Sequence, residues 1–159
     1  MIFHASIPAN EPERVARVIA ELWKGQTVPF PPIPGTWMAF SGDARGSEIE
    51  VSPRNIAFIP GANEIAYRDQ PETPQHSSAH LLIASVLDAD EILAIAQREG
   101  WTARKCRRGA PGPMGFDLIE FWVENVFMLE VATAESSRQY LDFMTGAPAR
   151  EMFGLKAAA

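Results

Sequence analysis

The sequence contains little cysteine and histidine and no long apolar stretch. Its 159 residues include one cysteine, Cys106, and three histidines. A single cysteine excludes an intrachain disulfide and a zinc site built from several cysteines. No run approaches the roughly 20 apolar residues that span a bilayer, and the first ten residues lack the basic and apolar regions of a signal peptide. We therefore expect a cytoplasmic protein with no membrane partner.

Positive charge is also scarce. The chain has 14 Lys and Arg against 20 Asp and Glu, which gives a net charge of −6 and a pI near 5.1. Nucleic-acid-binding proteins carry basic patches, so we expect no nucleic-acid partner. The hydrophobic content of 47% and the charged content of 21% are those of a globular protein. A small molecule or another protein remains as the expected partner.

Apolar spacing and turn residues predict a strand, a helix and then further strands in the first half. Residues 1–8 are typical of a strand, and residues 11–24 of a helix that Asn10 caps and Gly25 ends. The proline-rich segment 27–35 can form only an edge strand or a loop. Three further strand candidates follow, at residues 36–41, 48–51 and 55–59.

The same order of elements returns after a polar, proline-containing segment at residues 68–77. Asp88 with Glu91 has the spacing of a capping box and predicts a helix that ends at Gly100. The remaining candidates are strands at 79–86, 101–108, 116–123 and 126–131 and a helix at 136–144. We therefore predict one α+β domain, residues 1–159, made of two βαβββ modules. The first covers residues 1–66, a linker covers 67–78, and the second covers 79–145 with the C-terminal helix.

The two halves also match residue by residue at a few positions. At an offset of 76, His4 falls on His80, and Ile7, Ile19 and Ala20 fall on identical residues. At an offset of 80, Ile49-Glu50-Val51 matches Leu129-Glu130-Val131. Each half therefore opens on a strand with a histidine and closes on a strand with an apolar-Glu-Val sequence.

Strand alternation places these polar side chains on the face away from the helices. In the closing strands the apolar neighbours face the helix, so Glu50 and Glu130 face the other way. If the two sheets curl around a shared cleft, His4, Glu50, His80 and Glu130 point into it. A glutamate in an apolar strand is costly unless it is paired or ligated. Taken alone, each histidine is better explained as a strand residue hydrogen-bonded to the backbone, and only their equivalent positions in the repeat favour a metal site. Glu48 shares the face of Glu50 and could be a base, a substitute ligand or a surface residue.

Two imidazoles and two carboxylates suit a divalent metal ion. They balance its charge, and Zn, Ni, Co, Mn or Fe(II) would accept this set while leaving positions open for substrate. The metal would polarise a carbonyl, and Glu50 or Glu130 would act catalytically as the proton shuttle.

The paired βαβββ order, with His on the first strand and Glu on the last, resembles the vicinal oxygen chelate superfamily. That superfamily includes glyoxalase I, bleomycin-resistance proteins, extradiol dioxygenases, fosfomycin-resistance enzymes and methylmalonyl-CoA epimerase. Carried over, its metal ligands fall on His4, Glu50, His80 and Glu130, a set closest to that of glyoxalase I. The resemblance implies a homodimeric, metal-dependent lyase or isomerase acting on a small carbonyl substrate. A metal-free binding protein of the bleomycin-resistance kind and an Fe(II) extradiol dioxygenase are the alternatives.

Some residues keep two interpretations. The basic side chains of segment 101–108 would attract an anionic substrate group at the rim of a cleft, or would lie on a solvated strand edge. They are Arg104, Lys105, Arg107 and Arg108. Cys106 lies among these cations, an environment that can lower a thiol pKa. The glutathione-gripping residues of glyoxalase I have no counterpart, so the substrate stays open.

Overall fold

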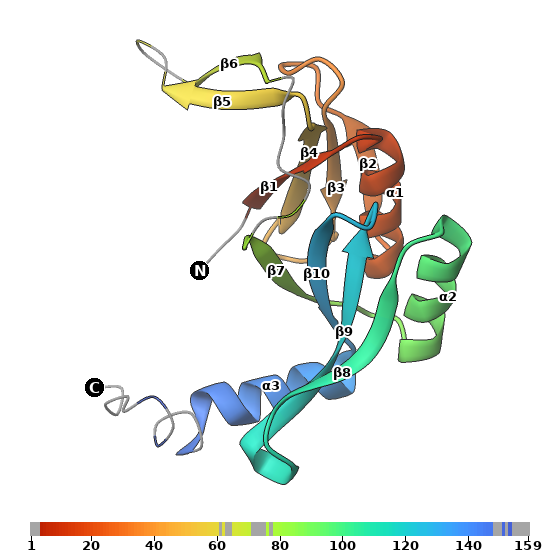
Figure 1. Ribbon diagram of the computed structural model, residues 1–159, viewed down its shortest axis with the longest axis vertical. Coiled ribbons are helices and arrows are strands. Elements are labelled where there is room, and N and C mark those ends of the chain that lie inside the picture. The colour runs from red at the N-terminus through yellow and green to blue at the C-terminus, as the bar shows by residue number, and fades with distance from the viewer. Residues whose placement is uncertain are drawn as a thin grey trace. The chain divides into compact units, whose positions relative to one another are not determined.

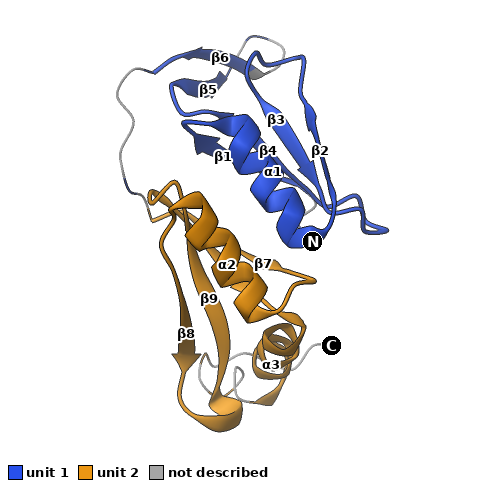
Figure 2. Ribbon diagram, turned by 90° about the vertical axis from the view of Figure 1, so that its right-hand side faces the viewer, with its two compact units in different colours: residues 1–77 blue, residues 78–159 orange. Residues whose placement is uncertain are grey.

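The chain divides into two compact units, Met1–Ser77 and Ser78–Ala159 (Figure 2). The computed structural model describes residues 4–60, 62, 65–70, 76, 78–147, 151 and 153. The start of the predicted first strand (1–3) and part of the predicted linker (71–75 and 77) lie outside them. Each unit is described by itself below.

Unit 1 contains a four-stranded sheet with one helix on it (Figure 1). Its elements are β1 (His4–Ala9), α1 (Pro12–Trp23), β2 (Gln26–Pro29), β3 (Trp37–Phe40) and β4 (Glu48–Pro53). The strand order is β1-β4-β3-β2, with β1 parallel to β4. The prolines of segment 27–35 confine β2 to four residues at the edge, as predicted.

The α1 helix forms because its apolar residues recur every three or four positions. Val15, Ile19 and Leu22 are fully buried against the sheet, where Ile49 and Val51 of β4 meet them from the predicted face. The predicted N-cap is wrong, because the cap residue is Glu11 and no side chain accepts a cap hydrogen bond.

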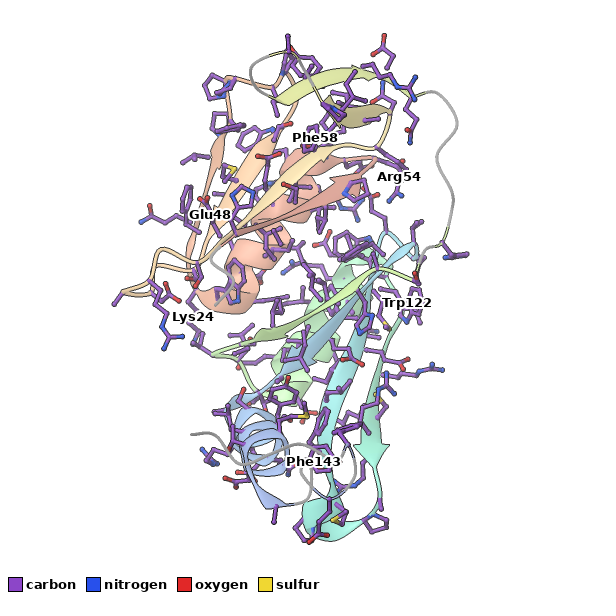
Figure 3. The ribbon with its side chains drawn as sticks, turned by 90° about the vertical axis from the view of Figure 1, so that its left-hand side faces the viewer. Lys24, Glu48, Arg54, Phe58, Trp122 and Phe143 are labelled. Atoms are coloured by element: carbon purple, nitrogen blue, oxygen red, sulfur yellow. The ribbon has the colours of Figure 1, made fainter. Side chains whose placement is uncertain are left out.

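A separate two-stranded sheet follows β4. Its strands are β5 (Ile56–Pro60) and β6 (Ile65–Asp69), which pair antiparallel. The prediction that residues 55–59 prolong the main sheet is therefore wrong, and regular structure extends into the segment that was expected to be a linker. Phe58 of β5 (Figure 3) and Tyr67 of β6 face each other across the two strands and are exposed.

Unit 2 repeats the order of unit 1. Its elements are β7 (His80–Ala84), α2 (Ala89–Glu99), β8 (Ala103–Gly109), the 3-10 turn η1 (Gly112–Met114), β9 (Gly115–Val123), β10 (Phe127–Ala132) and α3 (Ala134–Thr145). The sheet order is β7-β10-β9-β8, with β7 parallel to β10. The predicted capping box at Asp88 and Glu91 is present. Both units thus have the βαβββ order, and the α+β prediction is confirmed.

The sheet of unit 2 has buried apolar residues on both faces. Phe121, Leu129 and Val131 are fully buried on one face. On the other, Phe143 of α3 packs with Phe116 and Leu118 of β9 (Figure 3). Because Phe116 and Leu118 alternate with the first group along the strand, α3 covers the face that also carries Glu120 and Glu130. Within the described residues, no helix is long and apolar enough to cross a membrane.

Candidate functional site

In unit 1, His4 and Glu50 lie on neighbouring parallel strands. The register pairs His4 of β1 with Glu48 of β4 and Ser6 with Glu50, so His4 lies two residues along from Glu50, on the same face. His4 Nε2 is 4.0 Å from Glu50 Oε2. The ring is 42% exposed, whereas the carboxylate is buried. The Ser6 hydroxyl lies 3.2 Å from the same ring nitrogen.

In unit 2, His80 and Glu130 have the same arrangement. Leu82 of β7 pairs with Glu130 of β10, and His80 Nε2 is 3.9 Å from Glu130 Oε2. The ring is 48% exposed and the carboxylate is again buried. The two units therefore share their strand order and also the separation of histidine Nε2 from glutamate Oε2, which is 4.0 Å in unit 1 and 3.9 Å in unit 2.

The second nitrogen of each ring has an acceptor beside it. His4 Nδ1 is 3.1 Å from Glu48 Oε1, and His80 Nδ1 is 3.5 Å from the Ser78 carbonyl oxygen. An acceptor at Nδ1 favours the proton on that nitrogen and leaves Nε2 as the acceptor, as in histidines that bind metals. In unit 1 the Ser6 hydroxyl also lies beside this Nε2. Glu48 (Figure 3) therefore lies at the nitrogen that faces away from Glu50. The register places Met128 at its position in unit 2.

The two glutamates differ in the donor that holds Oε1. In unit 1 the Ser52 hydroxyl donates to Glu50 Oε1 at 3.0 Å, and the buried Thr36 hydroxyl donates to Ser52 at 3.1 Å. In unit 2 Arg108 Nε donates to Glu130 Oε1 at 3.0 Å, and Arg108 Nη2 is 2.8 Å from the same oxygen. One carboxylate is thus held by a neutral group and the other by a cation.

A second buried carboxylate enlarges the network in unit 2. Glu120 lies directly across from Glu130 on β9 and accepts a hydrogen bond from Arg108 Nη2 at 2.8 Å. Arg104 Nε donates to the other oxygen of Glu120 at 2.5 Å. Arg108, with Arg104, holds the pKa of Glu120 below its usual value, and Glu120 raises the pKa of Arg108 in return. We call these four residues, Arg104, Arg108, Glu120 and Glu130, the ion ladder.

Among the described residues of unit 1 no such ladder forms, because uncharged residues lie at the corresponding positions and the edge strand is shorter. Met38 lies opposite Glu50 where unit 2 has Glu120, and Val28 lies opposite Met38 where unit 2 has Arg104. Arg108 follows Arg104 by four residues within β8. The residue that follows Val28 by four is Pro32, which lies beyond the end of β2. β8 continues for seven residues, whereas β2 ends at Pro29.

The other two basic residues of β8 lie on the opposite face and are paired. Lys105 binds Asp90 at 2.8 Å and Arg107 binds Asp117 at 2.9 Å. These exposed pairs fit the interpretation of a solvated strand edge. For Cys106, burial raises the thiol pKa, which corrects the expectation of a lowered value. A pocket of about 420 Å³ beside Lys105, Arg107 and Ser136 contains none of the predicted ligands.

The donor atoms of each pair fit a metal ion. A separation of 3.9–4.0 Å is too long for a hydrogen bond. Two ligands that each lie about 2.0–2.2 Å from one ion are at most about 4.4 Å apart, so one ion can bridge each pair. In the part of the chain that the structure describes, no three His, Cys, Asp or Glu side chains are arranged to hold a metal. Each unit supplies a pair, and the shared four-residue cleft stays a prediction.

Sequence reasoning missed the residues that position the ligands. Ser52 and Thr36 were not singled out, and Glu120 was assigned no role. A signal was present in β8, where Arg104 and Arg108 share the strand face opposite to that of Lys105 and Arg107.

No protein-family model and no curated protein sequence matches the chain. Among solved structures, the fosfomycin resistance protein FosX from Mesorhizobium loti is 14% identical, with a TM-score of 0.51 over 88% of this chain and 97% of that chain. A member of the glyoxalase/bleomycin resistance protein/dioxygenase superfamily from Sphaerobacter thermophilus is 12% identical, with a TM-score of 0.53 over 84% and 96%. The chain has the vicinal oxygen chelate fold. FosX from Listeria monocytogenes shares that fold at 10% identity and a TM-score of 0.51, over 86% of this chain and 96% of that chain. Vicinal oxygen chelate folds are built from paired βαβββ modules, which agrees with the two units.

Proposed function

We propose that the protein is a metal-dependent lyase or isomerase that acts on a small carbonyl substrate. His4, Glu50, His80 and Glu130 are its proposed ligands for a divalent ion such as Zn, Ni, Co, Mn or Fe(II). One observation carries the proposal: both units present a histidine Nε2 and a glutamate Oε2 at 4.0 and 3.9 Å, each ring having an acceptor at Nδ1. Ordinary surface ion pairs have no reason to repeat these atoms in both halves.

The bound ion would polarise a substrate carbonyl and stabilise the anion that forms when an adjacent proton leaves. The chain's own residues hold and move that proton. Ser52 would hold Oε1 of Glu50, so Oε2 is the atom that would accept the proton once it has left the ion. Arg108 would hold Oε1 of Glu130 in the same way, so Oε2 of Glu130 is the alternative acceptor after it has left the ion. Glu48 and the Ser78 carbonyl keep the histidine rings in one orientation.

Metal analysis tests this proposal. We expect about one divalent ion per chain in the purified protein by mass spectrometry, and a loss of at least tenfold in affinity for both His4→Ala and His80→Ala. His76→Ala is the matched control because this exposed histidine is not a proposed ligand. Protein without a divalent ion, together with an unchanged affinity in His80→Ala, would contradict the proposal.

A metal-free binding protein is the second candidate, and the ion ladder is the observation that favours it. Arg108 already balances the charge of Glu130 without any metal. Such a protein would bind its small molecule equally well after chelation, whereas the proposed enzyme would lose activity. Binding measured before and after treatment with a chelator separates the two.

We also propose that the protein forms a homodimer, as the resemblance implies. Light scattering in solution tests this, and a mass of 17.5 kDa, that of one chain, would contradict it.

A further inference from the structure

We infer that the positive charge of Arg108 weakens the binding of a divalent cation at Glu130 and thereby makes the unit 2 pair contribute less to metal binding than the unit 1 pair. Glu50 is then the carboxylate that binds the ion more strongly. The inference rests on the proposed function in taking both glutamates as ligands. It adds a residue that sets metal affinity, and its test does not depend on catalysis.

The contacts of Arg108 support this role. Its guanidinium bridges two buried carboxylates, with Nη2 at 2.8 Å from both Glu130 Oε1 and Glu120 Oε1. Glu120 and Glu130 face each other directly across neighbouring strands, an arrangement that repels unless a cation lies between them. Arginine suits this position because its planar fork can bind both carboxylates at once.

The charges around each pair lead to the same conclusion. In unit 2 the ion ladder sums to zero before any metal binds, since two guanidiniums balance two carboxylates. In unit 1 the carboxylates of Glu48 and Glu50 surround His4, and within the described residues no lysine or arginine contacts either of them. The carboxylates of unit 1 are therefore available to balance the charge of a divalent ion, whereas the carboxylates of unit 2 are already balanced by arginines.

Arg108 contacts the oxygen of Glu130 that does not face the histidine. Both Ser52 and Arg108 occupy Oε1 and leave Oε2 toward the histidine. Arg108 therefore does not block the ligand atom. It acts through its charge, because a cation one carboxylate away from the metal is expected to weaken binding by about tenfold or more.

The test removes the charge of Arg108. Arg108→Met is expected to bind Co²⁺ about tenfold more tightly than wild type, by calorimetry and by the Co²⁺ absorption bands. Its melting temperature should be lower than wild type without metal, because two buried carboxylates then repel each other, and should rise further on adding Co²⁺. Arg108→Lys keeps the charge and should bind Co²⁺ within about threefold of wild type. Adding Glu130→Gln to Arg108→Met should cancel the gain.

Arg107→Met is the matched control. Arg107 lies on the same strand, points to the opposite face and pairs with the exposed Asp117, so its removal should leave Co²⁺ affinity unchanged. If Arg108→Met does not fold, the comparison moves to single glutamate variants. Glu50→Gln should then lower Co²⁺ affinity at least tenfold more than Glu130→Gln does, and equal losses would overturn the inference.

The outcomes separate the inference from the proposed function. Weaker or unchanged Co²⁺ binding in Arg108→Met overturns the inference, since a purely positioning residue loses affinity when it is removed. A wild type that holds no metal, beside an Arg108→Met variant that binds Co²⁺, supports the inference and overturns the proposed function. Absence of binding in both proteins overturns both.

Discussion

In unit 1 the buried Glu50 carboxylate accepts a hydrogen bond from the Ser52 hydroxyl, whereas in unit 2 the corresponding Glu130 is held by the Arg108 guanidinium. The strands that carry the glutamates and the histidines have the same order and register in both units. The difference arises at the edge strand, where β8 is longer than β2 and carries Arg108, and at the strand beside it, where Glu120 takes the place of Met38. An edge strand can therefore change the charge at a site without altering the pairing of the strands that build it.

The elements that follow the last strand also differ. In unit 1 the β5–β6 pair follows β4, whereas in unit 2 the α3 helix follows β10 and packs on Phe116 and Leu118. These two residues lie on the same face as the ion ladder. α3 therefore packs on the same face as the ion ladder, whereas the Arg104 and Arg108 side chains stay partly exposed.

The largest expected difference between the units is in their cores. Phe121 of β9 is fully buried, and its ring centroid lies 5.8 Å from that of Trp101 in an edge-on arrangement. Phe121 lies opposite Leu129, and the residue opposite the corresponding Ile49 in unit 1 is Ala39. We expect Phe121→Ala to lower the free energy of unfolding by about 3–5 kcal/mol in urea titrations. Val28→Ala, at an exposed position of β2, should change it by less than about 0.5 kcal/mol. A loss below about 1 kcal/mol for Phe121→Ala would contradict this view of the core.

The ion ladder should make unit 2 sensitive to acid. We expect Glu120→Gln to cost about 1.5–3 kcal/mol at pH 7, because Glu120 accepts charge-assisted hydrogen bonds from Arg104 and Arg108. Because folding lowers the pKa of Glu120, this stabilisation is fully present above the usual value of 4.5 and is lost as the pH falls below it. Urea titrations of metal-free protein at pH 7 and pH 3 measure the difference in the free energy of unfolding between variant and wild type. We expect this difference to be smaller at pH 3.

Met38→Leu is the control for the acid test, since Met38 takes the place of Glu120 in unit 1 and carries no charge. Its effect on stability should be the same at both pH values. If the free energies of unfolding of Glu120→Gln and wild type differ by the same amount at pH 7 and pH 3, the ion ladder does not stabilise the folded state.

Replacing Glu48 by the residue that unit 2 has at this position tests how the His4 ring is held. Glu48→Met removes the acceptor at His4 Nδ1 and one negative charge, so we expect Co²⁺ affinity to fall about tenfold by calorimetry. Met128→Leu is the matched change in unit 2 and should have no effect. If both variants bind Co²⁺ as wild type does, Glu48 has no part in positioning the ring.

The smallest expected difference is in how much the N-cap residues of α1 and α2 add to the free energy of unfolding. Asp88 accepts hydrogen bonds from the backbone N–H groups of Asp90 and Glu91, and Asp88→Ala should cost about 1 kcal/mol in thermal unfolding. No side chain accepts a cap hydrogen bond at the start of α1, and Glu11 forms an exposed ion pair with Arg14. Glu11→Ala should therefore cost less than about 0.5 kcal/mol. Equal losses would show that the capping box adds nothing beyond a surface charge.

Local patterns predicted much of the fold. The three- and four-residue spacing of apolar side chains gave α1 and α2, and alternation placed Ile49 and Val51 under the helix with Glu50 on the other face. The N-cap of α1 was misjudged because Asn10 and Glu13 have the spacing of a capping box that the backbone does not form. The β5–β6 pair was missed because a polar stretch hides the second strand.

The candidate site was predicted only in part. The repeat offsets identified His4, Glu50, His80 and Glu130, and the structure brings them together as one pair in each unit. Strand alternation in β8 puts Arg104 and Arg108 on one face, but the contact of Arg108 with Glu130 depends on the register across three strands and on how far β8 extends beyond β2. Ser52 was also missed, since it acts two positions along its own strand and was not part of any motif.

Each histidine–glutamate pair joins the first strand of a unit to its last, since β1 lies beside β4 and β7 beside β10. Each pair therefore exists only where the first and last strands of its unit lie side by side, and bringing them together closes a loop that contains the helix and the two other strands. A cation that binds a pair would favour the state in which these two strands are paired over states in which they are apart.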